Sequence, residues 1–374
     1  MIEQKDVVIV GAGPAGVGMA ALLRQIGVDN VSLLERYEVG ASFLRWPKET
    51  RFITPSFYAN PFGQIDLNAI TPNSSPALSA GVEHLDGAAY AKYLESVIDS
   101  NDLHTHTSTH IVEVSLTRKG KFRLLSSTGK KWETSVLVWA TGEYQFPDKN
   151  VFDGAEHCCH YANVRSWRDF KPDEYIVIGG YESAVDAALN LLDIGCSVKL
   201  LTRSAPWVNN HIADPSISLS PYTRQRLQKA MENRQFEIYE DADVTAVYQT
   251  SDPDVSYRVH TVDGRAWVTH QRPVLGTGFI CGGGARQLAP LFDWSDSGYP
   301  LLTPEDESTR FPGLFLVGPQ IRHGHNIFCF IYKFRQRFSA VAKAIAQNLS
   351  IPLTEEAWQE IEQDSCCQDD GCSC

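Results

Sequence analysis

Glycine-rich motifs with the spacing of dinucleotide-binding loops are the first residues of this sequence that indicate chemistry. Gly11-Ala12-Gly13-Pro14-Ala15-Gly16 follows the apolar run Val7–Val10 and leads into a helical pattern. In such a turn the backbone N–H groups and the positive end of the helix face a pyrophosphate. Gly11 allows the tight turn, Gly13 allows close approach to the phosphates, and Gly16 allows the helix to pack on the strand. The motif therefore predicts a dinucleotide site.

A carboxylate at the end of the next strand supports this prediction. The apolar run Val31–Leu34 ends at Glu35-Arg36, so strand, loop, helix and second strand lie within about 30 residues, the context that the fingerprint requires. A glutamate in this place accepts hydrogen bonds from ribose hydroxyls and repels a 2′-phosphate. The first unit is therefore expected to bind FAD or NAD rather than NADP.

A second unit of the same kind follows in the middle of the chain. The run Tyr175–Ile178 leads into Gly179-Gly180-Tyr181-Glu182-Ser183-Ala184, and the next strand ends at Thr202-Arg203. A guanidinium at that strand end suits the 2′-phosphate of NADPH, although a surface arginine near a strand end is the ordinary alternative. Because Tyr181 replaces the middle glycine, the Ser183 hydroxyl and the helix-terminal N–H groups are expected to compensate.

Cysteines crowd the end of the sequence. Four of the nine lie in the last nine residues, at Cys366, Cys367, Cys372 and Cys374. Three uses of this tail stay open: the four thiols bind a soft metal ion, Cys366 and Cys367 act as redox thiols that relay electrons, or the tail is inert. The neighbouring aspartates raise thiol pKa values, which disfavours a reactive thiolate but does not oppose a bound cation. An earlier cluster, Cys158-Cys159-His160, is interpreted as incidental.

The apolar runs place these motifs in an α/β fold. Val136–Trp139 is predicted to be a buried strand that ends at Thr141-Gly142, and Leu314–Val317 another that ends at Gly318. Ile111–Leu116 is predicted to pair with the run that follows it as a small antiparallel sheet. The apolar residues between Asn326 and Asn348 have the period of a helix.

Composition and charge exclude several classes of protein. With 374 residues, 43% of them apolar and 21% charged, the chain is expected to be globular rather than disordered or fibrous. Its net charge of −12 disfavours binding to nucleic acid or anionic lipid. No apolar run approaches the roughly 18 residues of a membrane span, and the N-terminus lacks a secretory pattern. We expect a cytoplasmic protein, with a homodimer as one candidate for its oligomeric state.

The order of these motifs resembles that of flavoproteins with two dinucleotide-binding domains, which include the pyridine nucleotide-disulfide oxidoreductases and the flavin monooxygenases. Residues 179–188 and 46–52 are similar to segments of the bacillithiol-disulfide-reductase-like flavoproteins, and the resemblance covers about residues 5–348. It implies two Rossmann-like domains, with an FAD domain that is interrupted by an inserted NADPH domain. The implied parts are residues 1–150 and 273–348 for FAD, residues 151–272 for NADPH, and residues 349–374 as an acidic cysteine-rich tail.

The resemblance also implies which residues hold the cofactors. Those for FAD are Gly11, Gly13, Pro14, Ala15, Gly16, Glu35, Arg36, Trp46, Thr50, Arg51, Ile111, Thr141, Gly142, Gly318 and Asn326. Those for NADPH are Gly179, Gly180, Ser183 and Arg203. Residues 326–348 would form a helix whose N-terminus points at the flavin, where its positive end would stabilise the anionic reduced ring.

Departures from the family patterns leave the reaction open. The CxxC and CxxxxC motifs of the disulfide reductases do not occur, Ala15 stands where related reductases often have cysteine, and Pro319-Gln320 replaces the usual aspartate after Gly318. Phe152–His157 is one residue short of the linker motif of flavin monooxygenases.

The sequence favours an FAD-dependent NADPH oxidoreductase that passes a hydride from NADPH to flavin and on to an unidentified thiol or small-molecule acceptor. The alternatives are a flavin monooxygenase and a non-catalytic flavoprotein or metal-handling protein that uses the cysteine tail.

Overall fold

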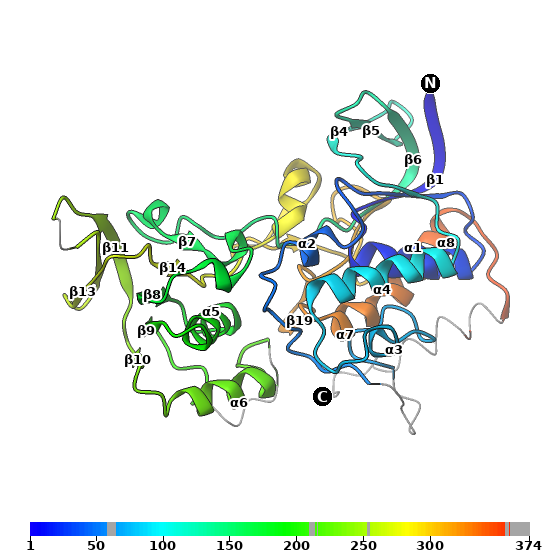
Figure 1. Cartoon of the computed structure of the whole chain (residues 1–374). Helices are drawn as coiled ribbons and strands as arrows, with labels where there is room; N and C mark the ends of the chain where they lie inside the picture. Colours follow the sequence, from blue (N-terminus) through cyan, green and yellow to red (C-terminus); the bar gives the residue numbers. More distant parts are fainter. Residues whose placement is uncertain (58–64, 209–213, 215, 253–254, 356–358, 360–374) are drawn as a thin grey trace. The chain divides into compact units, whose positions relative to one another are not determined.

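Two compact units make up the chain in the computed structural model, which describes all residues except 58–64, 209–213, 215, 253–254, 356–358 and 360–374 (Figure 1). The first unit contains Met1–Leu44, Pro55–Gln145 and the described residues from Cys281 onward, and the second contains Arg45–Thr54 and Phe146–Ile280. The second unit is thus inserted into the first in chain order, and a short early segment, 45–54, belongs to it.

A parallel sheet forms the centre of the first unit. Its strands are β1 (Ile2–Val10), β2 (Val31–Leu34), β3 (Thr105–His106), β6 (Lys131–Trp139) and β17 (Leu314–Leu316), in the order β3-β2-β1-β6 with β17 also paired to β6. Val7, Val8 and Ile9 of β1 are fully buried, as expected for a strand that is covered on both faces. The predicted antiparallel pair, β4 (Ile111–Leu116) and β5 (Phe122–Ser126), extends the sheet beyond β6.

Helices α1 (Pro14–Gln25), α4 (Gly87–Ser100) and α8 (Phe338–Asn348) pack together in this unit (Figure 1). Gly18 lets α1 and α8 approach, because a Cβ there would lie 2.4 Å from the ring of Phe338. A separate core joins Phe122, Trp132 and Leu316 of the sheet to the 3₁₀ segment Gly283–Leu291. The shorter elements of the unit are α2 (Ala41–Leu44), α3 (Pro76–Ala80), β15 (Asp293–Trp294) and β16 (Pro300–Leu301).

The second unit is also built on a parallel sheet, in the order β10-β9-β8-β14-β7. Its strands are β7 (Cys159–His160), β8 (Glu174–Ile178), β9 (Ser197–Leu201), β10 (Phe236–Tyr239) and β14 (Val274–Leu275). Helices α5 (Glu182–Asp193) and α6 (Pro221–Ala230) belong to it, and β11 (Val244–Gln249), β12 (Tyr257–Thr261) and β13 (Ala266–Thr269) form an antiparallel sheet. The short 3₁₀ turns are 155–157, 161–163 and 167–169. The prediction of two Rossmann-like α/β units is confirmed.

The helix predicted over 326–348 begins later than expected. Strands β18 (Arg322–His323) and β19 (Asn326–Ile327) form a hairpin around Gly324, which has a φ of +57°. Helix α7 (Ile331–Phe334) starts after the hairpin and continues through a 3₁₀ turn at 335–337 into α8. The prediction was therefore wrong for Asn326, which lies in a strand and not at a helix N-terminus. The apolar period misled because a short hairpin can place one or two apolar residues in phase with the following helix.

A buried carboxylate anchors this hairpin. His323 Nε2 donates to Asp306 Oδ1 at 2.5 Å, and the guanidinium of Arg337 reaches both oxygens of Asp306 at 3.1 Å. Asp306 is fully buried, so two cationic or polar partners are needed to compensate its lost hydration. These partners come from the hairpin and from the 3₁₀ turn between α7 and α8, so the buried carboxylate ties the hairpin to the helical segment that follows it.

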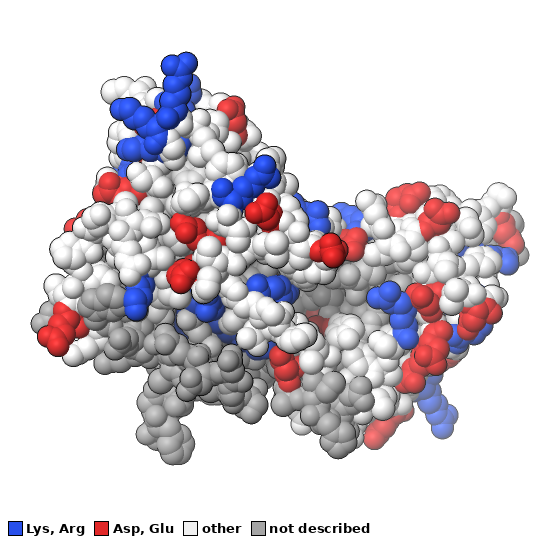
Figure 2. Space-filling view, turned by 180° about the vertical axis from the view of Figure 1, so that it is seen from behind, with Lys and Arg blue, Asp and Glu red and all other residues white. Residues whose placement is uncertain are grey.

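The surface carries both signs of charge. Figure 2 shows acidic and basic side chains intermixed over most of the face that it draws. Within the described part of the chain, no helix combines the length and the apolar character that crossing a membrane demands.

His160 is buried in the second unit and is bound on both sides by the backbone. Its Nδ1 accepts a hydrogen bond from the Ala162 N–H at 3.1 Å, so the neutral ring donates from Nε2 to the Gly278 carbonyl at 3.1 Å. Burial lowers the pKa of His160 to about 4. Because both ring nitrogens are engaged, the Cys158-Cys159-His160 cluster offers no free imidazole to a metal ion.

This environment predicts an acid-sensitive second unit. The pKa of His160 is lower in the folded than in the unfolded chain, so its stabilising contribution is complete above about pH 6.5 and is lost as the pH falls towards 4. His160→Gln should therefore flatten the pH dependence of the free energy of unfolding by about 2 kcal/mol between pH 7 and pH 5. Urea unfolding followed by tryptophan fluorescence measures this slope. The exposed His270→Gln serves as control, and equal slopes for wild type and His160→Gln would contradict the prediction.

Candidate functional site

The first glycine loop lies between the end of β1 and the start of α1. Gly11 has a φ of +108°, and a Cβ there would lie 2.4 Å from the Ala140 carbonyl oxygen. A Cβ at Gly16 would lie 1.9 Å from the Gly11 carbonyl oxygen, whereas one at Gly13 would meet no protein atom within 4 Å. Gly11 and Gly16 are thus required by packing inside the protein, and Gly13 borders open space. That open space is where a pyrophosphate fits.

The start of α1 supplies donors for an anion at this place. Pro14 occupies the first turn of the helix, where its missing N–H is of no consequence. The N–H groups of Ala15 and Gly16 have no acceptor within the helix, as in every first turn, and they add to the positive end of the helix dipole. The open space beside Gly13 and these N–H groups fit the pyrophosphate of FAD.

Glu35 is buried and tied to the same loop. Its Oε2 accepts a hydrogen bond from the Ala12 N–H at 2.8 Å, and its Oε1 accepts one from the Tyr37 N–H at 2.9 Å. Each carboxylate oxygen can accept a second hydrogen bond, so the pair can still receive ribose hydroxyls. Next to it, Arg36 is exposed and its guanidinium lies 4.9 Å from the centre of the Tyr37 ring.

The ends of two further strands converge on this loop. Gly318 follows β17 with a φ of +116°, and a Cβ there would lie 3.3 Å from the Cβ of Ala15. Thr141 follows β6, and its hydroxyl donates to Gln287 Oε1 at 2.8 Å. The Gly142 carbonyl accepts from the Gly284 N–H at 2.7 Å. The loop after β1 and the ends of β6 and β17 therefore meet at the carboxyl edge of the sheet, where α/β proteins bind their ligands.

A half-buried carboxyl that the sequence did not single out, Glu143, lies at the same edge. The Gly282 N–H donates to Gln320 Oε1 at 2.7 Å, which orients the amide so that its Nε2 donates to Glu143. Burial raises the pKa of Glu143, while Arg322 acts in the opposite direction. The Gln320 side chain thus holds the segment after Gly142 against the segment after Gly318. The only sequence signal was the unusual Pro319-Gln320 that follows Gly318.

Two of the predicted FAD residues lie elsewhere in the first unit. Ile111 is the first residue of β4 and pairs with Ser126, and Asn326 pairs with His323 in the hairpin. Their contact with FAD stays a prediction.

The second glycine loop connects β8 to α5. Gly179 has a φ of +132°, and a Cβ there would lie 2.4 Å from the Gly276 carbonyl oxygen. A Cβ at Gly180 would lie 2.0 Å from Thr202 Oγ1. Tyr181 precedes the first residue of α5, and its side chain is half exposed. The loop therefore tolerates a large residue at the position of the missing glycine because that side chain can turn outward.

The donors expected for NADPH are accessible. The Ser183 hydroxyl lies in the first turn of α5 and has no hydrogen-bond partner among the described residues. The Arg203 side chain follows β9 with 79% exposure, and its Nε lies 4.0 Å from Asp243 Oδ1. Such an exposed and long ion pair is weak, so the guanidinium is available to a phosphate.

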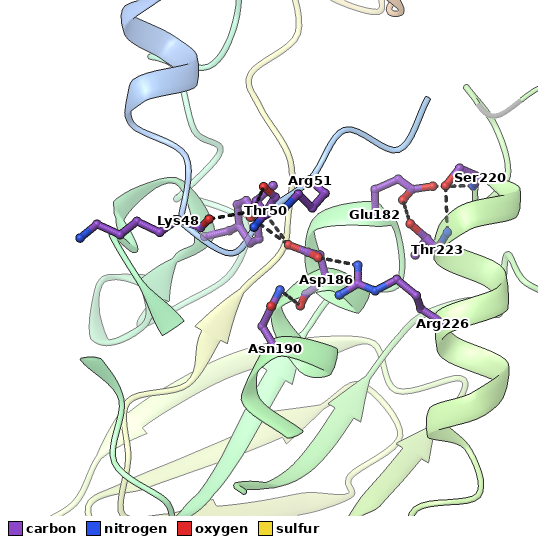
Figure 3. A network of polar contacts seen from close by, with 10 residues as sticks. Lys48, Thr50, Arg51, Glu182, Asp186, Asn190, Ser220, Thr223 and Arg226 are labelled. Atoms are coloured by element: carbon purple, nitrogen blue, oxygen red, sulfur yellow. Dashed lines mark hydrogen bonds and ion pairs between the residues drawn. The ribbon is translucent and has the colours of Figure 1, made fainter. Parts of the chain in front are cut away.

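Glu182 is the first residue of α5, where a free carboxylate would compete with a bound pyrophosphate. Its oxygens instead accept hydrogen bonds from the Ser220 N–H at 2.5 Å and from Thr223 Oγ1 at 2.5 Å. Both donors belong to the start of α6, which Ser220 caps through Thr223. Burial raises the pKa of Glu182. The Glu182 carboxylate therefore binds donors at the N-terminus of α6, although the residue itself belongs to α5 (Figure 3).

One turn further along α5, Asp186 joins three parts of the second unit (Figure 3). Its Oδ2 lies 3.0 Å from Thr50 Oγ1 and 2.7 Å from the Tyr161 hydroxyl, and its Oδ1 accepts from Arg226 of α6 at 2.8 Å. Asp186 is buried, so the ion pair and the two hydroxyls replace its hydration. Nothing in the sequence pattern marked this group, because its members are far apart in the chain.

The segment 45–54 is bound to the second unit by further contacts. Glu49 accepts hydrogen bonds from the Ser166 hydroxyl at 2.6 Å and from the Trp167 N–H at 2.9 Å. Arg51 donates to the carbonyls of Lys48 and Thr50, and the Trp46 and Phe52 ring centres are 5.0 Å apart. Contact of Trp46, Thr50 and Arg51 with FAD stays a prediction.

The thiols divide by exposure. Cys158 and Cys196 are buried and Cys281 is exposed. Burial raises the pKa of Cys158 to about 12, so this thiol stays protonated and unreactive near neutral pH. Cys366, Cys367, Cys372 and Cys374 lie outside the described residues, and the redox and metal roles expected for them stay predictions.

Known proteins share this arrangement. Residues 8–318 match the pyridine nucleotide-disulphide oxidoreductase family. The bacilliredoxin reductase Bdr of Bacillus subtilis is 25% identical over 215 residues, which are 56% of this chain and 62% of that protein. The chain spans only 34% to 62% of the length of the first curated relatives that it matches.

Solved structures show the same fold. The bacillithiol disulfide reductase Bdr of Staphylococcus aureus has a TM-score of 0.73 at 19% identity, covering 92% of this chain and 99% of that one. A flavin-containing monooxygenase of Stenotrophomonas maltophilia has a TM-score of 0.69 at 14% identity, with coverage of 93% and 99%. Two glycine loops on two parallel sheets, together with the match over residues 8–318, place this chain in the pyridine nucleotide-disulphide oxidoreductase family, with FAD and NADPH as its cofactors.

Proposed function

We propose that the protein is an FAD-dependent NADPH oxidoreductase that reduces a small-molecule or thiol-disulfide acceptor in the cytoplasm. The proposal rests on the two glycine loops and on the residue at the end of the strand that follows each loop. These two residues carry opposite charges. Glu35 is buried and bound to the first loop, and Arg203 is exposed beside the second. A carboxylate selects a ribose without a 2′-phosphate and a guanidinium selects one that carries it.

The first unit is proposed to hold FAD through its backbone and Glu35. The open space at Gly13 and the N–H groups of α1 bind the pyrophosphate, Glu35 accepts the ribose hydroxyls, and the Thr141-Gly142 and Gly318 strand ends border the rest of the cofactor. A bound flavin supplies hydride acceptance from a nicotinamide and electron transfer to a second substrate. Glu143, a half-buried carboxyl at this edge, has a pKa that burial raises above its ordinary value.

The second unit is proposed to hold NADPH. Gly179 and Gly180 keep the loop close to the sheet, the first turn of α5 and the Ser183 hydroxyl donate to the pyrophosphate, and Arg203 binds the 2′-phosphate. The Glu182 oxygens already accept hydrogen bonds from Ser220 and Thr223 at the start of α6.

The acceptor separates the two candidate reactions. Similarity to Bdr reductases favours a disulfide acceptor, and the tail cysteines would then supply a redox pair in place of the missing CxxC and CxxxxC motifs. Ala15 stands where related reductases often have cysteine, which counts against disulfide reduction and leaves a flavin monooxygenase as the second candidate. A metal-binding role of the tail and a homodimeric state are further proposals from the sequence.

Turnover of NADPH against a panel of acceptors tests the proposed function. We expect NADPH oxidation without oxygen when a disulfide or quinone is supplied, measured at 340 nm in an anaerobic cell. A chain that ends after Asn348 should lose disulfide reduction alone if the tail thiols relay electrons. Oxidation only in air, with a hydroxylated product, would establish the monooxygenase, and no turnover under either condition would contradict both.

Gly13→Val should abolish FAD binding while leaving the protein folded. The valine fits sterically, because Gly13 has an ordinary φ of −85° and open space beside it. Its side chain then fills the space of the pyrophosphate, so we expect purified protein without yellow colour but with unchanged far-UV circular dichroism. Gly13→Ala should show an intermediate flavin content. Full flavin occupancy in Gly13→Val would show that FAD binds elsewhere.

Arg203→Ala should remove the preference for NADPH over NADH. A charge-assisted contact with the 2′-phosphate contributes roughly 1.5–3 kcal/mol, or about ten- to a hundredfold in affinity. Stopped-flow reduction of the flavin by each nucleotide measures the change, and Arg234→Ala, an exposed arginine of the same unit, is the matched control. An unchanged ratio of second-order rates in Arg203→Ala would refute the assignment.

A further inference from the structure

Three side chains with metal-ligating atoms converge in the first unit, away from the glycine loop. They are Glu3 of β1, His106 of the edge strand β3, and His104 just before that strand, and their ligand atoms all lie within 4.8 Å of one another. The two imidazoles are two residues apart, so they share one face of an extended chain. Their ring centres lie 4.5 Å apart at an angle of 78°.

One of these ligand atoms is buried without a partner. His106 Nε2 is shielded from solvent and makes no hydrogen bond with any residue that the structure describes. The Glu3 Oε1 atom is 4.0 Å away from it, which is too far for a hydrogen bond. An orphaned nitrogen costs free energy in a folded protein. It therefore points to a group that is bound between His106, Glu3 and His104.

We propose that Glu3, His104 and His106 bind a divalent transition metal ion of the zinc class. Two imidazoles and one carboxylate form a ligand set that zinc uses in proteins, with a fourth position left for water. A triangle with sides of 4.8 Å has its centre about 2.8 Å from each corner, against roughly 2.0–2.2 Å for bound ligands. Side-chain movements of less than about an ångström would bring the ligand atoms to the bonding distance. His104 is exposed, so its side chain has room to move.

Two lysines oppose the ion. Glu3 now forms ion pairs with Lys5 at 3.3 Å and with Lys130 at 3.2 Å, so the metal must displace both ammonium groups from the carboxylate. Lys130 is about half exposed and can move into solvent. Lys130 and the metal ion compete for the Glu3 carboxylate, so removing the positive charge of Lys130 should strengthen metal binding. If the cluster were purely structural, the same change would remove a favourable ion pair and lower the stability of the protein.

A metal at this place would fasten the edge of the sheet. Strand β3 has only two residues, and the His106 carbonyl accepts the Glu35 N–H at 2.8 Å. The ion would connect this short strand to the start of β1 and so support the backbone beside Glu35. Because the metal binds the folded chain, its binding should also raise the melting temperature.

Titration of the full-length protein with ZnCl₂ alone tests the proposal. All accessible cysteines are first alkylated with iodoacetamide, which removes thiolate sites, including those of the tail. We expect one zinc equivalent to bind in calorimetry, and Co²⁺ to give visible absorption bands without a sulfur charge-transfer band. His104→Ala and His106→Gln should weaken binding by roughly tenfold or more, whereas His110→Ala should not. Lys130→Met should strengthen binding by roughly three- to tenfold.

Two outcomes would overturn the site. Zinc binding that disappears on alkylation belongs to cysteines, and unchanged titrations in both His104→Ala and His106→Gln would exclude these ligands. Far-UV circular dichroism of each variant before titration separates lost binding from lost folding. The readout does not involve flavin or NADPH, so it is independent of the proposed enzymatic function.

Discussion

Close approach of one backbone to another at the carboxyl edge of a sheet is the constraint on which both candidate sites depend. At Gly11 the loop lies against the Ala140 carbonyl, and at Gly179 the equivalent loop lies against the Gly276 carbonyl, with no room for a Cβ in either case. Both glycines also have positive φ values. Without these contacts the first turns of α1 and α5 would not face the edge of their sheets, and their N–H groups would not converge on one place.

The partners of each charged side chain determine which charges remain available to a ligand. In the first unit the Glu35 carboxylate is held by two backbone N–H groups, which keeps a negative charge buried beside the loop. In the second unit the acidic residues Glu182 and Asp186 are both engaged by α6, and Asp186 also by Thr50 and Tyr161. The exposed Arg203 is not neutralised in this way. This difference in charge underlies the opposite preferences for a 2′-phosphate that we propose for the two loops.

The polar network around Asp186 also accounts for the path of the chain. Residues 45–54 leave the first unit early in the sequence and are bound to the second by Glu49 and Thr50. A buried carboxylate with one partner missing is costly, so each contact of Asp186 depends on the others. Any motion of the second unit as a body would therefore carry this segment with it.

The sequence by itself determined the α/β class, the two glycine loops and the residues at the following strand ends. These depend on local rules: glycine spacing, apolar runs of strand length and the short reach between a strand and its helix. The tertiary structure alone decided that Asn326 lies in a hairpin, because the pairing of that hairpin depends on Asp306 and Arg337, distant in the chain. It also decided the partners of Thr50, Asp186 and Gln320, and the convergence of Glu3 with His104 and His106. Such contacts join residues tens to hundreds of positions apart, and a local pattern holds no information about them.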